Sequence, residues 1–109
     1  MRLRSLSMLK PLAAAALITA AGPATAQDAT ALRQNALAAT CANCHGTQGR
    51  AIDGAAVPGL AGMPAGYLVE QLKAFKAGTR PATVMHQLAK GYSDAQIDQI
   101  AAYYAAQKK

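Results

Sequence analysis

From Gln27 to the end of the chain, large apolar side chains are scarce. These 83 residues include 20 alanines but only 15 Val, Ile, Leu, Met or Phe residues, and no tryptophan. A domain of this size gains about 3–5 kcal/mol from its own core and usually needs a disulfide, a metal or a bound group. Cys41 and Cys44 could close only a short loop, which as a disulfide would constrain little of the unfolded chain. The composition therefore predicts one small domain whose core is completed by a bound group.

The first 26 residues have the pattern of a secretory signal peptide. Basic residues among the first ten precede an uncharged apolar run at 11–21, and small residues at 24–26 offer a cleavage site. The run has 11 residues, whereas a membrane-spanning helix needs about 20. We expect cleavage after Ala26, export to the periplasm and no stable membrane insertion afterwards. An uncleaved anchor or an ordinary buried helix is the alternative interpretation of this segment.

The charge of the chain argues against nucleic acid as a partner. The whole chain carries a net charge of +6, but from Gln27 onward eight basic and five acidic residues leave +3. The basic residues form no run beyond Lys108 and Lys109, whereas nucleic-acid-binding surfaces concentrate cationic side chains.

Four segments have helical patterns and none alternates like a strand, so the predicted fold class is all-α. The first helix is expected over 28–45, with Asp28 or Thr30 as its N-cap. Apolar residues at helical spacing would form one face of it: Leu32, Ala36 and Ala39.

The three later helices have clearer end signals. The second is expected to begin at Pro64 and to end before Gly78. A short helical turn is expected over 84–89. A capping box of Ser93 and Gln96 opens the last helix. Its apolar face would carry Ile97, Ile100 or Ala101, and Tyr104.

Residues 46–66 join the first two helices without any periodic pattern. They contain six glycines together with Pro58 and Pro64. An irregular stretch of about 20 residues inside a compact domain is uncommon unless it is functional. We interpret this segment as a loop that wraps around the bound group.

The pentapeptide Cys41-Ala42-Asn43-Cys44-His45 identifies that group, because C-x-x-C-H is the attachment pattern of c-type haem. Positions i, i+3 and i+4 share one face of a helix. Both cysteines can therefore form thioethers with the vinyl groups on one porphyrin edge, while His45 ligates the iron. A dithiol oxidoreductase would set C-x-x-C beside a βαβ pattern, and a zinc site needs about four ligands. A structural disulfide beside a chance histidine is the third alternative. Export, the thin core and the wrapping loop favour one covalent haem c.

At these residues the chain resembles class I cytochrome c. It is similar to the branch that holds cytochromes of the c-four type and the cytochrome subunit of flavocytochrome c sulfide dehydrogenase. The likeness rests on CANCHG (41–46), PGLAG (58–62), YLVEQLKAFKAGTR (67–80), Met85 and YSDAQIDQIAAYYAAQ (92–107). It implies a small class I fold whose N- and C-terminal helices pack together around the haem, in a mono-haem domain at 27–109. Members of this branch often carry two haem domains, whereas this chain has one CANCH.

The resemblance also implies a methionine as the second axial ligand of the iron. Met85 matches the family position and follows a helix that can carry the chain around the ring. Met63 and His86 are the alternative ligands, and an open sixth site is a further one. Adjacent residues diverge by about 100° on a helix, so Met85 and His86 cannot both face the iron. We expect His86 to be a surface histidine.

Three further residues are candidates for haem contacts. Pro58 is the family candidate for accepting a hydrogen bond from the ring of His45 through its backbone carbonyl, and a plain turn proline is the alternative. Arg80 and Tyr67 could bond the haem propionates. The alternatives are a cation at a helix end for Arg80 and a half-buried packing ring for Tyr67.

These features imply an electron-transfer protein rather than an enzyme, since two axial ligands leave no iron position for a substrate. Its partners would be a redox protein donor and acceptor. A cytochrome subunit of a flavoprotein sulfide dehydrogenase is one alternative, and a haem enzyme or gas sensor with an open sixth site is another. Docking would use a small apolar rim, with candidates Val57, Leu60 and Val84. Three lysines would add a local bias: Lys73, Lys76 and Lys90.

Overall fold

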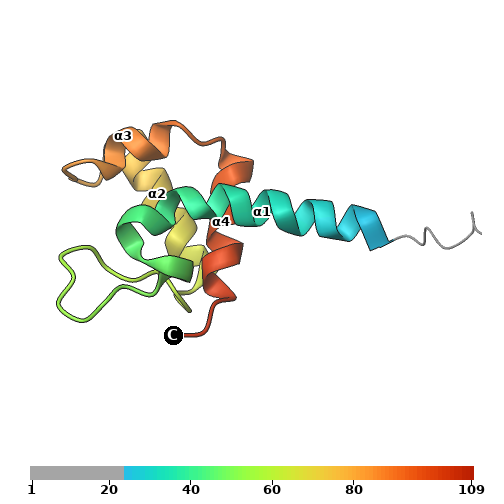
Figure 1. Ribbon diagram of the computed structural model, residues 1–109. Coiled ribbons are helices and arrows are strands. Elements are labelled where there is room, and N and C mark those ends of the chain that lie inside the picture. The colour runs from blue at the N-terminus through green and yellow to red at the C-terminus, as the bar shows by residue number, and fades with distance from the viewer. Residues whose placement is uncertain (1–23) are drawn as a thin grey trace, which may run out of the picture.

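The computed structural model describes residues 24–109, and these are helical without any strand (Figure 1). The elements are α1 (Ala24–His45), a 3₁₀ turn η1 (Thr47–Gly49), α2 (Ala65–Ala77), α3 (Met85–Lys90) and α4 (Asp94–Ala105). The predicted all-α fold is confirmed. Most of the expected signal peptide at 1–26 lies outside the described residues, and its last three residues form the start of α1.

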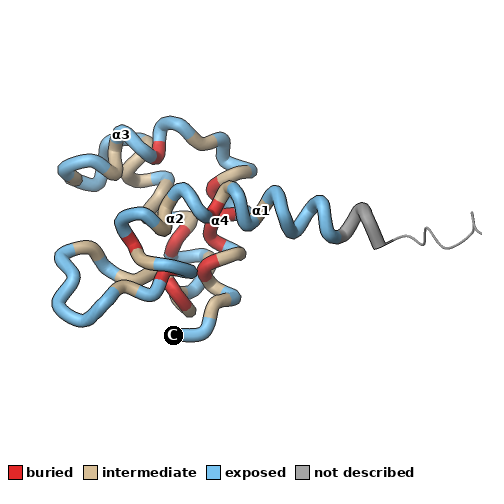
Figure 2. Tube along the Cα trace, viewed as in Figure 1, coloured by how far each residue is buried: buried red, intermediate tan, exposed pale blue. Residues whose placement is uncertain are grey.

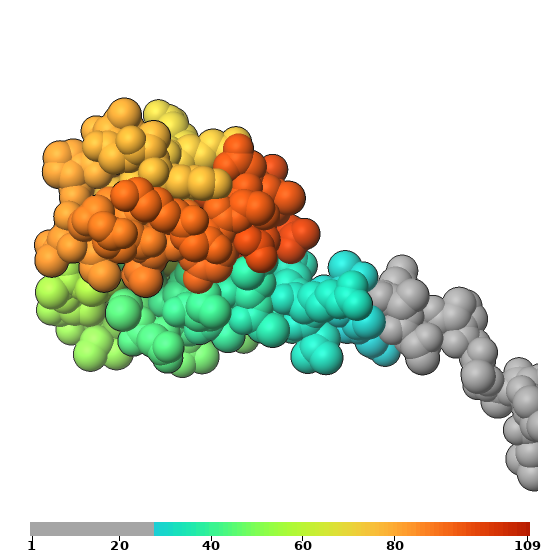
Figure 3. All heavy atoms as spheres, turned by 90° about the horizontal axis from the view of Figure 1, so that it is seen from above, coloured from blue at the N-terminus to red at the C-terminus, as the bar shows by residue number. Residues whose placement is uncertain are grey.

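Helix α1 differs from its prediction at its start and in its buried face. It begins at Ala24, so the expected N-caps Asp28 and Thr30 lie inside the helix, because the alanine-rich segment from Ala24 contains no helix breaker. The predicted apolar face is also wrong, since Leu32 is 69% exposed. Ala38 is buried instead, because α4 packs on that side. Figure 3 shows the first part of α1 projecting from the body, while its later part lies against the C-terminal segments.

The core lies where α1, α2 and α4 meet (Figure 2). Its buried cluster consists of Ala38, Leu68, Ile100, Ala101 and Tyr104. The Tyr104 hydroxyl donates a 2.6 Å hydrogen bond to the Ala38 carbonyl, and burial raises the pKa of this phenol, which keeps it protonated. The predicted packing of the N-terminal helix against the C-terminal helix is therefore present.

Local signals explain the ends of α2 and α4. Gly78 ends α2 in the left-handed conformation, as predicted, and Pro64 is the N-cap rather than the first helical residue. The predicted capping box of Ser93 and Gln96 is confirmed by both of its hydrogen bonds. Lys76 joins the two helices, since its Nζ lies 3.0 Å from an Asp94 carboxylate oxygen.

The connection from α1 to α2 is partly ordered by η1 and partly an exposed loop. The chain turns sharply after α1 at Gly46. Glycine is needed at this turn because a Cβ would lie 2.1 Å from the Arg50 carbonyl oxygen. Gly49 has φ +77° and passes so close to α4 that a Cβ would lie 2.7 Å from Tyr104 Cδ1. The loop 52–56 beyond it is exposed. Of the helices in residues 24–109, none is both long and apolar enough to cross a membrane.

Candidate functional site

The last turn of α1 carries Cys41, Cys44 and His45. The spacing i, i+3 and i+4 sets them on one side of the helix. Both cysteines are free thiols; Cys41 is half-buried and Cys44 is exposed. Because α1 ends at His45 and the chain turns away at Gly46, the three side chains stand at the helix end beside the loop.

The imidazole of His45 has one defined orientation. It is 8% exposed, and its Nδ1 lies 2.6 Å from the Pro58 carbonyl oxygen, which is the hydrogen bond that the resemblance implied. A carbonyl can only accept, so Nδ1 carries the proton and Nε2 keeps its lone pair. This is the tautomer in which a histidine ligates a metal through Nε2.

Burial keeps Cys41 in its thiol form. Desolvation raises the pKa of the Cys41 thiol above 9.0, while hydrogen bonds to Thr40 and Tyr104 act in the opposite direction. The Thr40 hydroxyl lies 3.8 Å from the Cys41 sulfur and 2.6 Å from the Tyr92 hydroxyl. Attachment of haem would add the sulfur and a hydrogen of each cysteine across a vinyl double bond, which requires both residues to be free of a disulfide. The contact between Thr40 and Tyr92 was not predicted, because no sequence signal pairs residues so distant along the chain.

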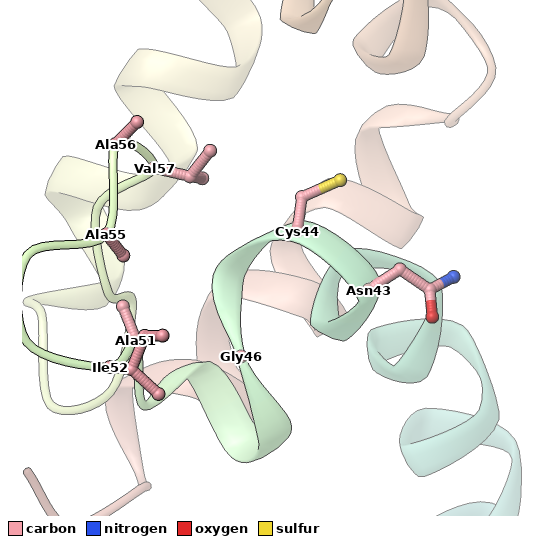
Figure 4. Close-up of a pocket in the computed structure, with 8 residues that line it drawn as sticks. All are labelled: Asn43, Cys44, Gly46, Ala51, Ile52, Ala55, Ala56 and Val57. Carbon is pink, nitrogen blue, oxygen red and sulfur yellow. The ribbon is translucent and has the colours of Figure 1, made fainter.

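A cavity of about 360 Å³ lies between the end of α1 and the following loop (Figure 4). In Figure 4, the Val57 side chain is directed toward the end of α1 that carries Cys44. The residues that line the cavity are all uncharged: Asn43, Cys44, Gly46, Ala51, Ile52, Ala55, Ala56 and Val57. The sequence prediction included Cys44 and Val57 but missed Ile52, which is 81% exposed.

The two candidate methionines have different surroundings. Met63 packs against the core cluster and lines a second cavity, of about 350 Å³, together with Gly49 and Lys109. Met85 is half-buried and is the first residue of α3. Met63 therefore serves the packing of the helices, whereas Met85 lies outside the core cluster.

The expectation that His86 is a surface histidine is wrong. The side chain is half-buried, and its Nδ1 is buried without a hydrogen-bond partner. The reason is the packing of α3, whose residue Ala89 is 0% exposed and lies one turn beyond His86.

Arg80 and Tyr67 are associated with one face of α2. Tyr67, Gln71 and Phe75 recur every four residues and so follow one side of that helix. The Arg80 guanidinium lies 4.6 Å from the centre of the Phe75 ring and donates a hydrogen bond to Gln71. Arg80 therefore folds back along the face that carries Tyr67.

The three residues expected to form an apolar rim are not equally exposed. Val84 is 51% exposed, whereas Val57 is half-buried. Leu60 is half-buried against the core cluster, because its N–H donates to the Gly49 carbonyl and holds it near α4.

The donor atoms of the site fit a covalently attached haem. Two free thiols stand one helical turn apart beside an imidazole with an available Nε2. Within residues 24–109, no group of three or more His, Cys, Asp and Glu side chains is arranged to hold a bare metal ion. The residues that would hold the group are therefore those of a porphyrin site, with thioethers from the cysteines and an iron ligand from His45.

Comparisons with known proteins agree with this interpretation. A family profile described as cytochrome c matches residues 29–107. The thiosulfate dehydrogenase electron acceptor of Thiomonas intermedia is 44% identical over 65% of this chain and 33% of its own length. The cytochrome subunit of sulfide dehydrogenase of Chlorobaculum tepidum is 39% identical over 78% of this chain and 74% of its own length.

A solved structure of Acidithiobacillus ferrooxidans cytochrome c4 has a similar fold. It aligns with a TM-score of 0.57 and 41% identity, over 61% of this chain and 37% of that chain. This chain therefore spans only about a third of the length of some of its relatives, including the thiosulfate dehydrogenase electron acceptor.

Proposed function

The chain belongs to the cytochrome c family, and we propose that it carries single electrons in the periplasm through one haem c. Proteins of this family bind haem covalently, and the haem iron supplies a one-electron couple when it is bound. Cys41 and Cys44 would form the two thioethers. The predicted signal peptide at 1–26 supports export to the periplasm, where we propose that the protein functions.

The hydrogen bond between His45 and Pro58 carries the proposal. This bond holds the buried imidazole of His45 in one tautomer, so that Nε2 is available as the first axial ligand. The same bond draws electron density toward the ligating nitrogen and makes the imidazole a stronger donor. A histidine that only filled space would not need this orientation.

Met85 is proposed as the second axial ligand. Of the two methionines in the described part of the chain, Met63 packs against the core cluster and Met85 does not. A thioether ligand raises the reduction potential of a haem relative to a second imidazole. With His45 and Met85 both bound, no coordination position remains for a substrate, and this supports a carrier rather than an enzyme.

Arg80 and Tyr67 are proposed to bond the haem propionates. A guanidinium has five N–H donors, so Arg80 can keep its contact with Gln71 and still donate to a carboxylate. Its stacking on Phe75 would fix the direction of the remaining donors.

The proposed electron donor is a dehydrogenase that oxidises an inorganic sulfur compound. This proposal rests on the names of two relatives, which accept electrons from thiosulfate dehydrogenase or form part of a sulfide dehydrogenase. A second candidate function is that of a cytochrome subunit held by a flavoprotein. The match to the sulfide dehydrogenase subunit favours it, because that match covers 78% of this chain.

The test begins with the full chain produced in a bacterium that attaches haem c. We expect the mass of one haem, which acid-acetone does not extract, and a ferric charge-transfer band from a methionine ligand. Met85→Leu should abolish this band while preserving side-chain volume, and Met63→Leu is the matched control that should keep it. Extractable haem would contradict the attachment, and loss of the band in Met63→Leu would reverse the ligand assignment.

Two further measurements separate the alternative functions. Ferrous protein of a carrier should bind carbon monoxide poorly, whereas a haem enzyme or gas sensor with an open site should bind it readily. Stable co-purification with a flavoprotein would favour the subunit over the free carrier.

A further inference from the structure

We propose that His86 is a reserve axial ligand, which takes the sixth iron position when the thioether of Met85 is lost. This inference rests on the proposed function, since it requires a haem attached at Cys41 and Cys44. It assigns a role to a side chain that neither the core nor the proposed primary ligand set uses.

The geometry of α3 sets Met85 and His86 on the same buried side. Ala89 is 0% exposed and marks the inward face of this helix. Met85 precedes Ala89 by four residues and His86 precedes it by three. At about 100° per residue, the two side chains therefore lie on either side of the direction in which Ala89 points, about 40° and about 60° from it. Leu88, next to Ala89 in the same helix, is 48% exposed and so lies on the outer side.

The ring of His86 has a nitrogen with nothing to bond. Its Nδ1 is buried and has no hydrogen-bond partner. Leaving such a group unsatisfied destabilises the folded protein, and native structures seldom retain one without a reason. A neutral imidazole is also a strong ligand for haem iron. The inward-facing imidazole of His86, which has no hydrogen-bond partner at Nδ1, is therefore suited to bind the iron once the Met85 sulfur no longer does.

The movement that this exchange needs is small. Neighbouring helical residues differ by about 100° in direction and about 1.5 Å in rise, so a shift of one residue in register exchanges one side chain for the other. Helix α3 has six residues, and the residues 78–81 and 83–84 before it are exposed. Helix α3 packs against α2, so the rotation would be confined to its first turn and to the exposed residues before it. Two side chains then serve one coordination position, and the iron stays six-coordinate when the thioether is lost.

The experiment compares five proteins with attached haem, using electron paramagnetic resonance for the ferric spin state and optical absorption for the methionine charge-transfer band. Wild type and His86→Gln should both show the methionine charge-transfer band. Met85→Leu should lose the band but remain low-spin, with the signature of two imidazole ligands. Met85→Leu/His86→Gln should become high-spin, and its ferrous form should bind carbon monoxide readily. Met85→Leu/Lys90→Gln is the matched control on the same helix and should remain low-spin.

The outcomes distinguish this inference from the proposed function. A high-spin Met85→Leu protein overturns the reserve role while leaving Met85 as the primary ligand. A double variant that remains low-spin also overturns it, because another base then occupies the iron. Loss of the methionine band in His86→Gln would mean that His86 supports Met85 rather than replaces it. A methionine band that survives in Met85→Leu defeats the ligand assignment of the proposed function itself. Because thioethers hold the haem, each spectrum can be recorded even if a variant is less stable.

Discussion

The helix junction, where α1, α2 and α4 meet around Tyr104, is filled by the chain's own side chains, whereas the surroundings of the loop 51–57 are not. The junction contains fully buried residues and a buried hydrogen bond from Tyr104 to Ala38. The loop has no buried residue, and Ile52 within it is 81% exposed. Figure 2 shows this contrast as buried segments at the crossing of the helices and exposed ones in the loop. The apolar side chains of this loop are thus left unburied beside the end of α1, where the haem is proposed to bind.

Removing the haem should have the largest effect on this contrast. Cys41→Ser/Cys44→Ser cannot form thioethers, and we expect the resulting haem-free protein to be molten or largely disordered. The expected loss is most of the net stability of a small domain, about 5 kcal/mol or more. Near-ultraviolet circular dichroism and calorimetry should show no cooperative thermal transition, even where some helical signal remains. A sharp cooperative melt would mean that the helix junction is sufficient to hold the fold.

Gly49→Ala should damage the junction directly. The residue has φ +77°, and its new Cβ would meet the Tyr104 ring at 2.7 Å and the Ala61 backbone nitrogen at 2.8 Å. Backbone strain and overpacking together should cost about 2–4 kcal/mol in denaturant unfolding of the haem protein. Gly54→Ala is the matched control, because it has φ +78° with no atom within 4 Å of the added Cβ. It should cost about 1 kcal/mol, from backbone strain alone. Equal costs would show that close packing at Gly49 is unimportant.

Tyr104→Phe should have a smaller effect on the same region. It removes the 2.6 Å hydrogen bond to the Ala38 carbonyl but keeps the ring in the core. A hydrogen bond of this kind contributes about 1 kcal/mol, which urea unfolding can resolve. Tyr103→Phe, on the neighbouring half-buried ring, is the control and should cost less. If both variants are equally stable, the contrast between the two regions depends on apolar packing alone.

Asp94→Asn should have the smallest effect, and only in acid. The hydrogen bond and charge of Lys76, with a further contribution from Lys73, lower the pKa of the Asp94 carboxyl from 3.8. A lowered folded-state pKa means that the ion pair stabilises the protein above pH 3.8 and that this contribution is lost as pH falls through the lowered value. The carboxyl is exposed, so the variant should differ slightly from wild type near pH 6 and converge with it at low pH. Thermal unfolding between pH 2 and pH 6 checks this, and a difference that grows toward low pH would be the opposite of the expected sign.

Backbone rules made the helix ends predictable from the sequence. Gly78 can adopt a left-handed conformation cheaply, and Ser93 with Gln96 satisfies the free amides at the start of α4, so neither depends on distant contacts. The C-x-x-C-H spacing likewise indicates chemistry without knowledge of the fold.

Faces that are settled by packing could not be predicted in the same way. Helix α1 carries alanines on most of its faces, so its sequence pattern did not distinguish the exposed side with Leu32 from the buried side with Ala38. The packing of distant helices decides between them, including the hydrogen bond to Ala38 from Tyr104, 66 residues away along the chain. The half-burial of His86 has the same origin, because it follows from how α3 packs and not from the residues next to it.

The hydrogen bond that orients His45 ends on a backbone atom, and this makes it unusual in its response to mutation. Every amino acid carries a carbonyl, so no substitution at Pro58 deletes the acceptor, whereas any substitution of His45 except one that keeps a ring N–H deletes the donor. What can remove the acceptor is a change in the course of the chain, through an insertion or deletion in the loop 51–57. The orientation of the His45 ring therefore depends on the length of this loop rather than on the side chain at position 58. It can persist in relatives that have another residue in place of Pro58.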